Sequence, residues 1–382
     1  MNMLKKLLSM LLCAVLLFVT AVPVLADSGS QMSMTYVNPL YPQLTPPAQS
    51  HAVKAPPVRA VQRDSLEEAV PDLREGLKNR ETTITVSFLA PDYNREMMSK
   101  LFHLAIAHTG NPTEGDYLAW HYTDWSASMS ITTLKDGYRN EVTYTVNYLS
   151  TQQQEKTLDA QVDQLLDQLN VYRASDYEKL SAVYDYLCQN ITYDHAGAEN
   201  DDPLAHTAYA ALIKRTSVCQ GYASLLYRMM LALDVDIRMV AGIGNGGAHG
   251  WNIVKMDGLY YAVDATWDAT MRQSGSPYKY FLRCEQNFED HTRDAEYLTE
   301  EFQRAYPMAQ SDYTGQTQIV IGDLDGKNGV TEDDAIYLLQ HVLMPAIFPV
   351  SQAVDYSKNG TVDEDDAIYL LQHVLMPGVF PL

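Results

Sequence analysis

The chain has 382 residues, and its 48 Asp and Glu outnumber its 27 Lys and Arg, so that the formal net charge is −21. This length allows two or three domains, and the negative charge argues against nucleic acid or an anionic membrane surface as a partner. Four cysteines are too few for a disulfide scaffold in a chain of this size.

Residues 1–26 have the form of a secretory signal peptide. Two lysines precede an apolar run at 7–19, and a small residue, Ala26, ends the segment. The run is too short for a comfortable membrane span, and no second long apolar stretch follows it. We therefore expect a secreted protein, extracellular or held in a cell-surface complex, without an integral membrane span. A lipoprotein anchored through Cys13 is disfavoured because Leu12 stands where a small residue is needed.

The next two segments differ in pattern. Residues 27–62 are rich in Pro, Gln and Ser and lack apolar periodicity, which predicts a linker or an extended arm. Residues 63–155 alternate apolar and polar side chains at 82–88 and at 142–148, and they show helical spacing at 92–109. We expect a small α+β region here that serves in packing or in substrate recognition.

The segment 156–300 contains a cysteine at the start of an expected helix, in the stretch SVCQGYASLLYRMM from Ser217 to Met230. The apolar residues recur along one stripe of the helix, and Thr216 or Ser217 can cap it. Cys219 then lies in the first turn, where the helix dipole favours a thiolate. The position suits a nucleophile, although a cysteine can also be a small apolar residue that begins a helix.

A predicted hairpin further along the chain supplies a base and a group that orients it. Asp257-Gly258 separates two alternating segments and is typical of a two-residue turn, which sets the register of the two strands. In that register His249 lies opposite Thr266 and is a diagonal neighbour of Asp264 on the same face of the sheet. Diagonal neighbours lie about 7–8 Å apart at Cα, within reach of an imidazole and a carboxylate. The sequence therefore predicts a His249–Asp264 pair.

Other groups compete for these roles. Three further histidines are alternative bases: His195, His206 and His291. None of them lies in a strand that the sequence pairs with an acid, so packing or surface positions are favoured. Asp268 is an alternative orienting group. Cys188 is expected to be a buried thiol, and its pairing with Cys284 stays open. A zinc site is disfavoured because neither C-x-x-C nor H-x-x-x-H spacing occurs.

Three motifs in this order resemble one family. HTAYAAL at 206–212, SVCQGYA at 217–223 and HGWNIVKMDGLYYAVDATWD at 249–268 are similar to segments of the bacterial transglutaminase-like, or transglutaminase/protease-like, superfamily. The resemblance covers about residues 160–295 and implies a papain-like α/β core. One departure is Gly250, which differs from the HAWN-like string of relatives.

The resemblance also implies acyl-transfer chemistry. Cys219 would be the nucleophile, His249 the general base and acid, and Asp264 the group that orients the imidazole. The thiolate would attack a glutamine or peptide amide, and water or an amine would resolve the thioester. The backbone N–H of Cys219 is a natural donor to the oxyanion, whereas a second donor, such as Gln189, stays unassigned.

This chemistry leaves the outcome of the reaction open. We expect a protein or peptide substrate and no organic cofactor. A peptidase or amidase is favoured over a protein-crosslinking transglutaminase, because water is abundant outside the cell and no amine-acceptor site is evident. A non-catalytic binding module on the same fold is the alternative from another class.

The C-terminal part repeats itself. DDAIYLLQHVLMP occurs at Asp333–Pro345 and, 32 residues later, at Asp365–Pro377. An acidic loop precedes each copy, with oxygen-bearing side chains at the spacing that binds one Ca²⁺. The expected ligands are Asp323, Asp325, Thr331 and Asp334 in the first loop and Asp355, Ser357, Asn359, Thr361 (through its carbonyl), Asp363 and Asp366 in the second. Lys327 breaks the pattern of the first loop, so that loop should bind Ca²⁺ more weakly, and two solvated acidic turns are the alternative.

The duplicated loop–helix unit at 320–382 resembles a type I dockerin. This resemblance implies that the unit folds on calcium and binds the cohesin domain of a scaffolding or cell-surface protein. Residues 301–319 are expected to be a linker. The predicted fold class is α+β, with a papain-like transglutaminase core, a small N-terminal α+β region and a C-terminal all-α calcium-binding dockerin.

Overall fold

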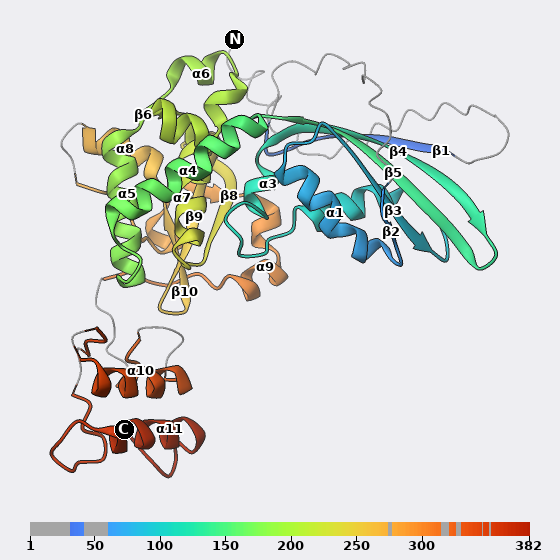
Figure 1. Cartoon of the computed structure of the whole chain (residues 1–382). Helices are drawn as coiled ribbons and strands as arrows, with labels where there is room; N and C mark the ends of the chain where they lie inside the picture. The colour runs from blue at the N-terminus through green and yellow to red at the C-terminus, as the bar shows by residue number, and fades with distance from the viewer. Residues whose placement is uncertain are drawn as a thin grey trace.

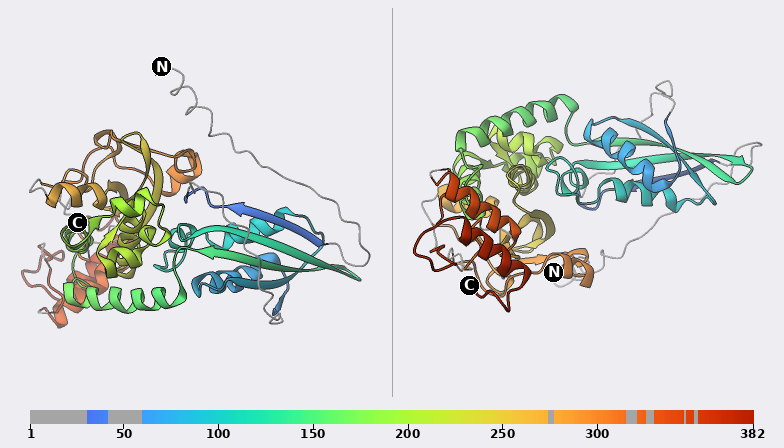
Figure 2. Two further views of the ribbon diagram at one scale, coloured as in Figure 1. Left: turned by 90° about the horizontal axis from the view of Figure 1, so that it is seen from above. Right: turned by 60° about the horizontal axis from the view of Figure 1, so that its bottom comes forward.

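The computed structural model describes residues 31–41, 60–273, 277–314, 321–325, 330–345, 347–350 and 353–382. The expected signal peptide and most of the expected linker at 27–62 lie outside these residues. Within the described ranges, no helix is long and apolar enough to cross a membrane. The chain forms an N-terminal unit built on one sheet, a central unit of helices packed on a second sheet, and a pair of C-terminal helices (Figures 1 and 2).

The N-terminal unit is a five-stranded sheet in the order β1-β4-β5-β3-β2. Neighbouring strands are antiparallel except β2 and β3. The elements are β1 (Gln31–Val37), β2 (Gln62–Arg63), α1 (Leu66–Lys78), β3 (Thr83–Ala90), α2 (Glu96–Ala105), α3 (Asp116–Ala119), β4 (Tyr122–Leu134) and β5 (Gly137–Tyr148). Apolar side chains of α1, α2, α3 and the sheet share one core, in which Phe102 stacks on Trp125. The alternating segments at 82–88 and 142–148 are strands, as their period of two predicts.

Strand β1 corrects the prediction of a linker throughout 27–62. It pairs with β4 along its whole length, and Met32, Met34 and Tyr36 pack on the core. The ring of Tyr36 stacks on Trp125 with the ring centroids 5.5 Å apart. This stretch has few apolar residues and lies in a Pro-rich segment, so its sequence alone does not predict a strand. It forms one because the edge of β4 is available for pairing.

The central unit packs helices against a four-stranded antiparallel sheet in the order β10-β9-β8-β11. Its longer elements are α4 (Gln152–Leu169), α5 (Asp176–Asn190), α7 (Cys219–Ala232), β8 (Ile237–Gly244), β9 (Gly247–Met256), β10 (Leu259–Val263) and α8 (Ala265–Gln273). Its shorter elements are β6 (Thr192–Tyr193), α6 (His195–Glu199), η1 (Pro203–His206), η2 (Ala210–Lys214), β7 (Thr216–Ser217), η3 (Glu285–Asn287), β11 (His291–Arg293), η4 (Ala295–Leu298) and α9 (Glu300–Ala305). Ser175 and Glu178 form the predicted capping box of α5.

Helix α7 passes through the middle of this unit (Figure 1). The sequence predicted a single apolar stripe, but every residue from Gln220 to Leu231 is buried. The polar residues of the helix have partners, since the Ser224 hydroxyl donates to a backbone carbonyl and Arg228 pairs with Glu155 of α4. A helix packed on all sides holds its first residue, Cys219, in a defined place.

The segment after η4 corrects the prediction of a linker at 301–319. Helix α9 begins at Glu300, Ala309 is 1% exposed, and the backbone N–H of Tyr313 donates to the carbonyl of Leu282 at 3.0 Å. Residues 301–313 therefore belong to the central unit. The sequence suggested a linker because this segment is mostly polar. Only a few small or aromatic side chains of the segment contact the central unit.

The C-terminal unit consists of α10 (Glu332–Leu343) and α11 (Glu364–Leu375), which lie side by side in both figures. Its core contains Ala335, Leu338, Val354, Tyr356, Ala367 and Leu370. Each helix begins with a capping box, formed by Thr331 with Asp334 and by Asp363 with Asp366. The repeat of the sequence is thus a repeat of structure, as its period predicts.

Candidate active site

Cys219 is the first residue of α7, and its side chain is partly exposed. The predicted cap is wrong, because Val218 holds the capping position and no side chain bonds to the helix start. Ser217 instead donates its hydroxyl to the carbonyl of Ala205 at 2.6 Å. Without a side-chain cap, the positive end of the helix dipole faces the sulfur.

The predicted hairpin is confirmed. Met256 pairs with Leu259 across the turn, and both turn residues have positive φ, 50° at Asp257 and 84° at Gly258. The pairing ends at Val263, because the chain then turns into α8. His249 therefore does not lie opposite Thr266, although the predicted side-chain contact with Asp264 is formed.

His249 and Asp264 form a buried hydrogen-bonded pair. His249 Nε2 lies 2.8 Å from Asp264 Oδ2, and the two side chains are 7% and 1% exposed. The other carboxylate oxygen accepts the backbone N–H groups of Thr266 and Trp267, at 2.9 and 3.3 Å, at the start of α8. The start of a helix thus holds the carboxylate in place, and the carboxylate holds the imidazole.

Asp264 and Cys219 together change the protonation of His249. Burial lowers the pKa of His249, but the charge and hydrogen bond of Asp264, together with the hydrogen bond and charge of the Cys219 sulfur, raise it to about 10. Since Nε2 serves Asp264, Nδ1 is the ring nitrogen left for the sulfur. A charged imidazole beside the sulfur can give its proton to a leaving group.

Two tryptophans of the central unit flank the imidazole. The ring of His249 stacks on Trp267 at 5.0 Å and on Trp251 at 5.9 Å between centroids. A third tryptophan, Trp120, comes from the N-terminal unit at the end of α3. A Cβ on Gly250 would lie 2.6 Å from its ring, so the ring can pack this closely on β9 only at a glycine. The N-terminal unit thereby packs against β9 at the residue next to His249.

The residue after the cysteine links the same two units. Gln220 Nε2 donates to the carbonyl of Trp120, and its Oε1 accepts from His206 Nδ1 at 3.1 Å. Gln189, the suggested second oxyanion donor, is an exposed residue of α5. Burial, and after it the charge of Cys219, raises the pKa of Tyr193 to about 12. This phenol therefore stays protonated and able to donate near neutral pH.

Asp268, the alternative orienting group, and His195, an alternative base, make no side-chain hydrogen bond to His249 or Asp264 within the part of the chain that the structure describes. Asp268 accepts hydrogen bonds from the Tyr184 hydroxyl at 2.7 Å and from the backbone N–H groups of Lys279 and Tyr280, and it stabilises the loop after α8. His195 is exposed at the start of α6. The described cysteines, 188, 219 and 284, are all free thiols, and Cys188 is fully buried as predicted.

His291 was assigned to packing or surface by sequence reasoning, and the structure corrects this. It lies in β11, and its Nε2 is 3.2 Å from Asp264 Oδ2. A short strand that joins the sheet edge at β8 brings it there, so no local pattern in the sequence pairs it with an acid. The ligand atoms of His249, Asp264 and His291 lie within 4.8 Å of one another, close enough to bind a metal ion, but here both histidines use these atoms to bond the carboxylate.

The first acidic loop brings its carboxylates together. Oxygen atoms of Asp323, Asp325 and Asp334 lie within 4.8 Å of one another, which fits a Ca²⁺ site. The fully buried Asp334 also accepts the backbone N–H of Thr331 at 2.8 Å. Lys327 lies outside the described residues.

The second acidic loop has the same plan. Asp355 accepts backbone N–H groups of Asn359 and Gly360, both at 3.1 Å, and Asp366 accepts that of Ser357 at 2.8 Å. Thr361 and Asn359 also donate hydrogen bonds to the partly exposed Asp363 side chain. The buried hydroxyl of Ser357 has no hydrogen-bond partner among the described residues, as suits an oxygen that serves a cation. This loop supplies the predicted types of oxygen ligand, but the carboxylates that lie within 4.8 Å of one another are those of the first loop.

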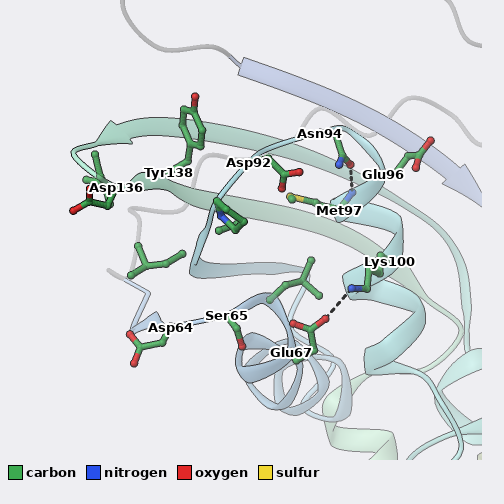
Figure 3. A pocket seen from close by; sticks show the side chains of 15 residues that line it. Asp64, Ser65, Glu67, Asp92, Asn94, Glu96, Met97, Lys100, Asp136 and Tyr138 are labelled. Atoms are coloured by element: carbon green, nitrogen blue, oxygen red, sulfur yellow. Dashed lines mark hydrogen bonds and ion pairs between the residues drawn. The ribbon is translucent and has the colours of Figure 1, made fainter.

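A cavity of about 650 Å³ lies elsewhere, in the N-terminal unit between α1, α2 and the β3 and β5 strands (Figure 3). Its rim carries five carboxylates and one amine: Asp64, Glu67, Asp92, Glu96, Asp136 and Lys100. Lys100 pairs with Glu67 at 2.7 Å. None of the residues lining this cavity belongs to the Cys219 site.

Comparisons with known proteins agree with the fold of the central unit. Residues 163–265 match the model of the transglutaminase-like superfamily, and this range contains Cys219, His249 and Asp264. Human kyphoscoliosis peptidase is 30% identical over 118 residues, and its mouse counterpart is 28% identical over 123. These matches cover 28% and 29% of this chain, but only 18% and 19% of the relatives. They support a transglutaminase-like domain in this part of the chain, of a kind related to cysteine peptidases and acyltransferases.

Two solved structures are also similar. One is described as a TGase, with 15% identity, a TM-score of 0.29 and coverage of 50% of this chain and 56% of that one. The other is described as a candidate cysteine protease from Cytophaga hutchinsonii, with 16% identity, a TM-score of 0.24 and coverage of 38% and 58%.

Proposed function

We propose that the central unit is a thiol enzyme that cleaves or transfers the acyl group of protein or peptide amides. The single observation that carries the proposal is the buried His249–Asp264 hydrogen bond of 2.8 Å beside a partly exposed cysteine at a helix start. Cys219 is the nucleophile, His249 the general base and acid, and Asp264 the group that orients the imidazole.

The proposed reaction has two halves. The Cys219 sulfur attacks the amide carbonyl carbon, the C–N bond breaks, and His249 gives its proton to the leaving amine or ammonia. A water molecule, or a second amine, then attacks the thioester, gives a proton to His249 and releases the sulfur. The backbone N–H of Cys219 supports the oxyanion in both halves, and the protonated hydroxyl of Tyr193 is a candidate for the second donor.

Labelling with iodoacetamide tests the activated nucleophile. We expect Cys219 to alkylate at least about tenfold faster than a free model thiol near neutral pH, because a thiolate, not a thiol, is the reacting form. The buried Cys188 and Cys284 serve as internal controls in peptide maps. His249→Ala should bring the rate down to that of the model thiol. A parent rate no faster than the model thiol would leave a non-catalytic binding module as the better account.

A tagged amine supplied with a protein substrate decides the outcome of the reaction. We favour hydrolysis, with new chain termini or released ammonia and no incorporated tag. Incorporation of the tag that depends on Cys219 would instead establish a protein-crosslinking transglutaminase. Cys219→Ser is the control for both readings.

We also propose that the C-terminal unit is a calcium-dependent dockerin that tethers a secreted enzyme to a cohesin-bearing protein of a cell-surface or extracellular complex. The support is a duplicated apolar face. Five residues of α10 and its tail are at least 42% exposed: Ile336, Leu339, Leu343, Met344 and Ile347. Their equivalents in α11 are at least 40% exposed: Ile368, Leu371, Leu375, Met376 and Val379. Large apolar side chains gathered on one exposed face are typical of a protein interface.

A further inference from the structure

The carboxylate of Asp264 accepts hydrogen bonds from two histidines, and the mechanism above uses only one of them. Nε2 of His249 lies 2.8 Å from Oδ2, and Nε2 of His291 lies 3.2 Å from the same oxygen. The two backbone N–H groups at the start of α8 bond the other oxygen. His291 therefore completes the set of donors that surround the carboxylate.

The ring of His291 is held firmly. Its side chain is 1% exposed and stacks on Phe288 with the centroids 3.9 Å apart. The ring centroids of Trp267 and Trp251 lie 4.3 and 4.9 Å from that of His291, so His291 shares both tryptophans with His249. Backbone pairing of β11 with β8 fixes the Cα of His291 opposite Gly244. A ring with this packing can serve as a rigid support.

The bond to the carboxylate sets the tautomer of the ring. Nε2 must carry the proton that it donates to Asp264, so in the neutral ring Nδ1 is an acceptor. Nδ1 is buried and has no partner among the described residues. His291, Glu285 and Arg293 help to line an adjoining cavity of about 20 Å³, which has room for one water molecule. A water there would donate to Nδ1 and keep the proton on Nε2.

We propose that His291 is a positioning residue of the thiol enzyme, which through its Nε2–H holds the Asp264 carboxylate in the orientation that His249 needs. The inference deepens the proposed function and rests on it for its kinetic consequence. His291 acts through Asp264, so its loss affects the Cys219–His249 pair only by way of the carboxylate. With one donor fewer, Asp264 is less well fixed, and the imidazole bonded to it is less well aligned with the sulfur.

Two variants separate the hydrogen bond from the packing. His291→Gln keeps an N–H donor at about the reach of Nε2, whereas His291→Met has nearly the same shape as the Gln variant without the donor. We expect His291→Met to lower the rate of Cys219 alkylation by iodoacetamide about tenfold or more near neutral pH, and His291→Gln to stay within about threefold of the parent. Equal rates in the two variants would overturn the proposal, because a role in packing alone does not distinguish them.

A measurement on the full-length parent keeps the proposal testable if a variant does not fold. In protein labelled with ¹⁵N at histidine, we expect the His291 ring to carry its proton on Nε2, with a signal that shifts in Asp264→Asn. A ring protonated on Nδ1 alone would overturn the inference. Failure of the proposed function looks different, since the parent itself would then alkylate no faster than a model thiol while the His291 signal still reported the bond to Asp264.

Discussion

Two glycines show how single residues shape the site. A Cβ on Gly221 would lie 1.9 Å from the Ser217 hydroxyl and 2.7 Å from the carbonyl of Thr207, so the first turn of α7 can approach these groups only with glycine. In the same way, Gly250 leaves room for the ring of Trp120, which would lie 2.6 Å from a Cβ at this position. The Gly in Cys-Gln-Gly-Tyr and in His-Gly-Trp is therefore a spatial requirement of the folded chain.

The Gly250→Ala variant tests the contact with Trp120. The added methyl group meets an aromatic ring at 2.6 Å, so the ring or β9 must shift, which should destabilise the protein by about 1–3 kcal/mol and slow the alkylation of Cys219. Urea unfolding and iodoacetamide labelling measure the two effects. Gly247→Ala is the matched control in the same strand, because the nearest atom there lies 3.9 Å away. A Gly250 variant as stable and reactive as this control would contradict the account.

The His249–Asp264 pair should make stability depend on pH. The pKa of His249 is raised to about 10, so its contribution is complete below its unfolded pKa of about 6.5 and is lost as the pH rises through 10. The pKa of Asp264 is lowered, against the effect of burial, by the charge and hydrogen bond of His249, so its contribution is present above its unfolded pKa of about 3.9 and is lost in acid. The stabilisation is therefore greatest between about pH 4 and 6.5.

Melting temperatures of the parent and of His249→Gln measure this dependence. We expect the difference between them to be largest near about pH 5–6 and to shrink steadily toward about pH 10. The change in packing caused by the substitution adds an offset that does not vary with pH. A difference that stays constant from acid to alkaline pH would mean that the histidine is not charged in the folded protein.

At the scale of the elements, a buried ionic cluster joins the N-terminal unit to α4 and α7. Glu155 of α4 bonds the Tyr117 hydroxyl at 2.7 Å and pairs with Arg80 at 3.1 Å and Arg228 at 3.4 Å. Burial opposes its charge, but the two arginines and His121 lower the pKa of Glu155 to about 2. The helix that begins with Cys219 is thus anchored, through Arg228, to a carboxylate shared with the N-terminal unit.

Glu155→Gln should destabilise the protein strongly, by about 3–5 kcal/mol, because two guanidinium groups that are 2% and 4% exposed lose their shared countercharge. Glu67→Gln makes the same chemical change at an exposed pair with Lys100 and should alter the free energy of unfolding by less than about 1 kcal/mol. Urea unfolding of both variants at one pH checks the comparison. Similar small losses in both would show that the buried cluster does not hold the units together.

At the scale of the whole molecule, the chain combines a transglutaminase-like central unit, an N-terminal sheet unit that packs against it, and a duplicated C-terminal unit with a core of its own. Trp120 and Gln220 connect the first two units at the site itself. Among the described residues, the C-terminal core contains only side chains from Leu324 onward. The first two units should therefore act together, whereas the third should fold and bind by itself.

Removal of calcium tests this independence. We expect EGTA to unfold residues 320–382 and abolish cohesin binding, while the alkylation of Cys219 stays unchanged, because the proposed ligands all lie in the two loops. Circular dichroism and limited proteolysis follow the unfolding. In calorimetric titrations, Asp355→Asn should remove the tighter binding step and Asp323→Asn the weaker one. Loss of the thiol reactivity together with the C-terminal structure would show that the units depend on each other.

The sequence by itself determined the features whose signals are local. The turn at Asp257-Gly258 sets a hairpin register that brings His249 to Asp264, and the 32-residue repeat sets two equivalent helices with capped starts. The presence of a helix after Cys219 follows from apolar spacing, whereas its burial on all sides does not. In each case neighbours within a few residues supply the deciding interactions, so one sequence segment contains the whole signal.

Only the tertiary structure showed the contacts between residues that lie far apart in the sequence. His291 reaches Asp264 because β11 joins the edge of β8, Trp120 reaches Gly250 from another unit, and β1 forms because β4 has an edge to offer. No pattern near these residues distinguishes them from packing or linker residues. Contacts between distant segments depend on how the units pack, and that information lies in the whole chain.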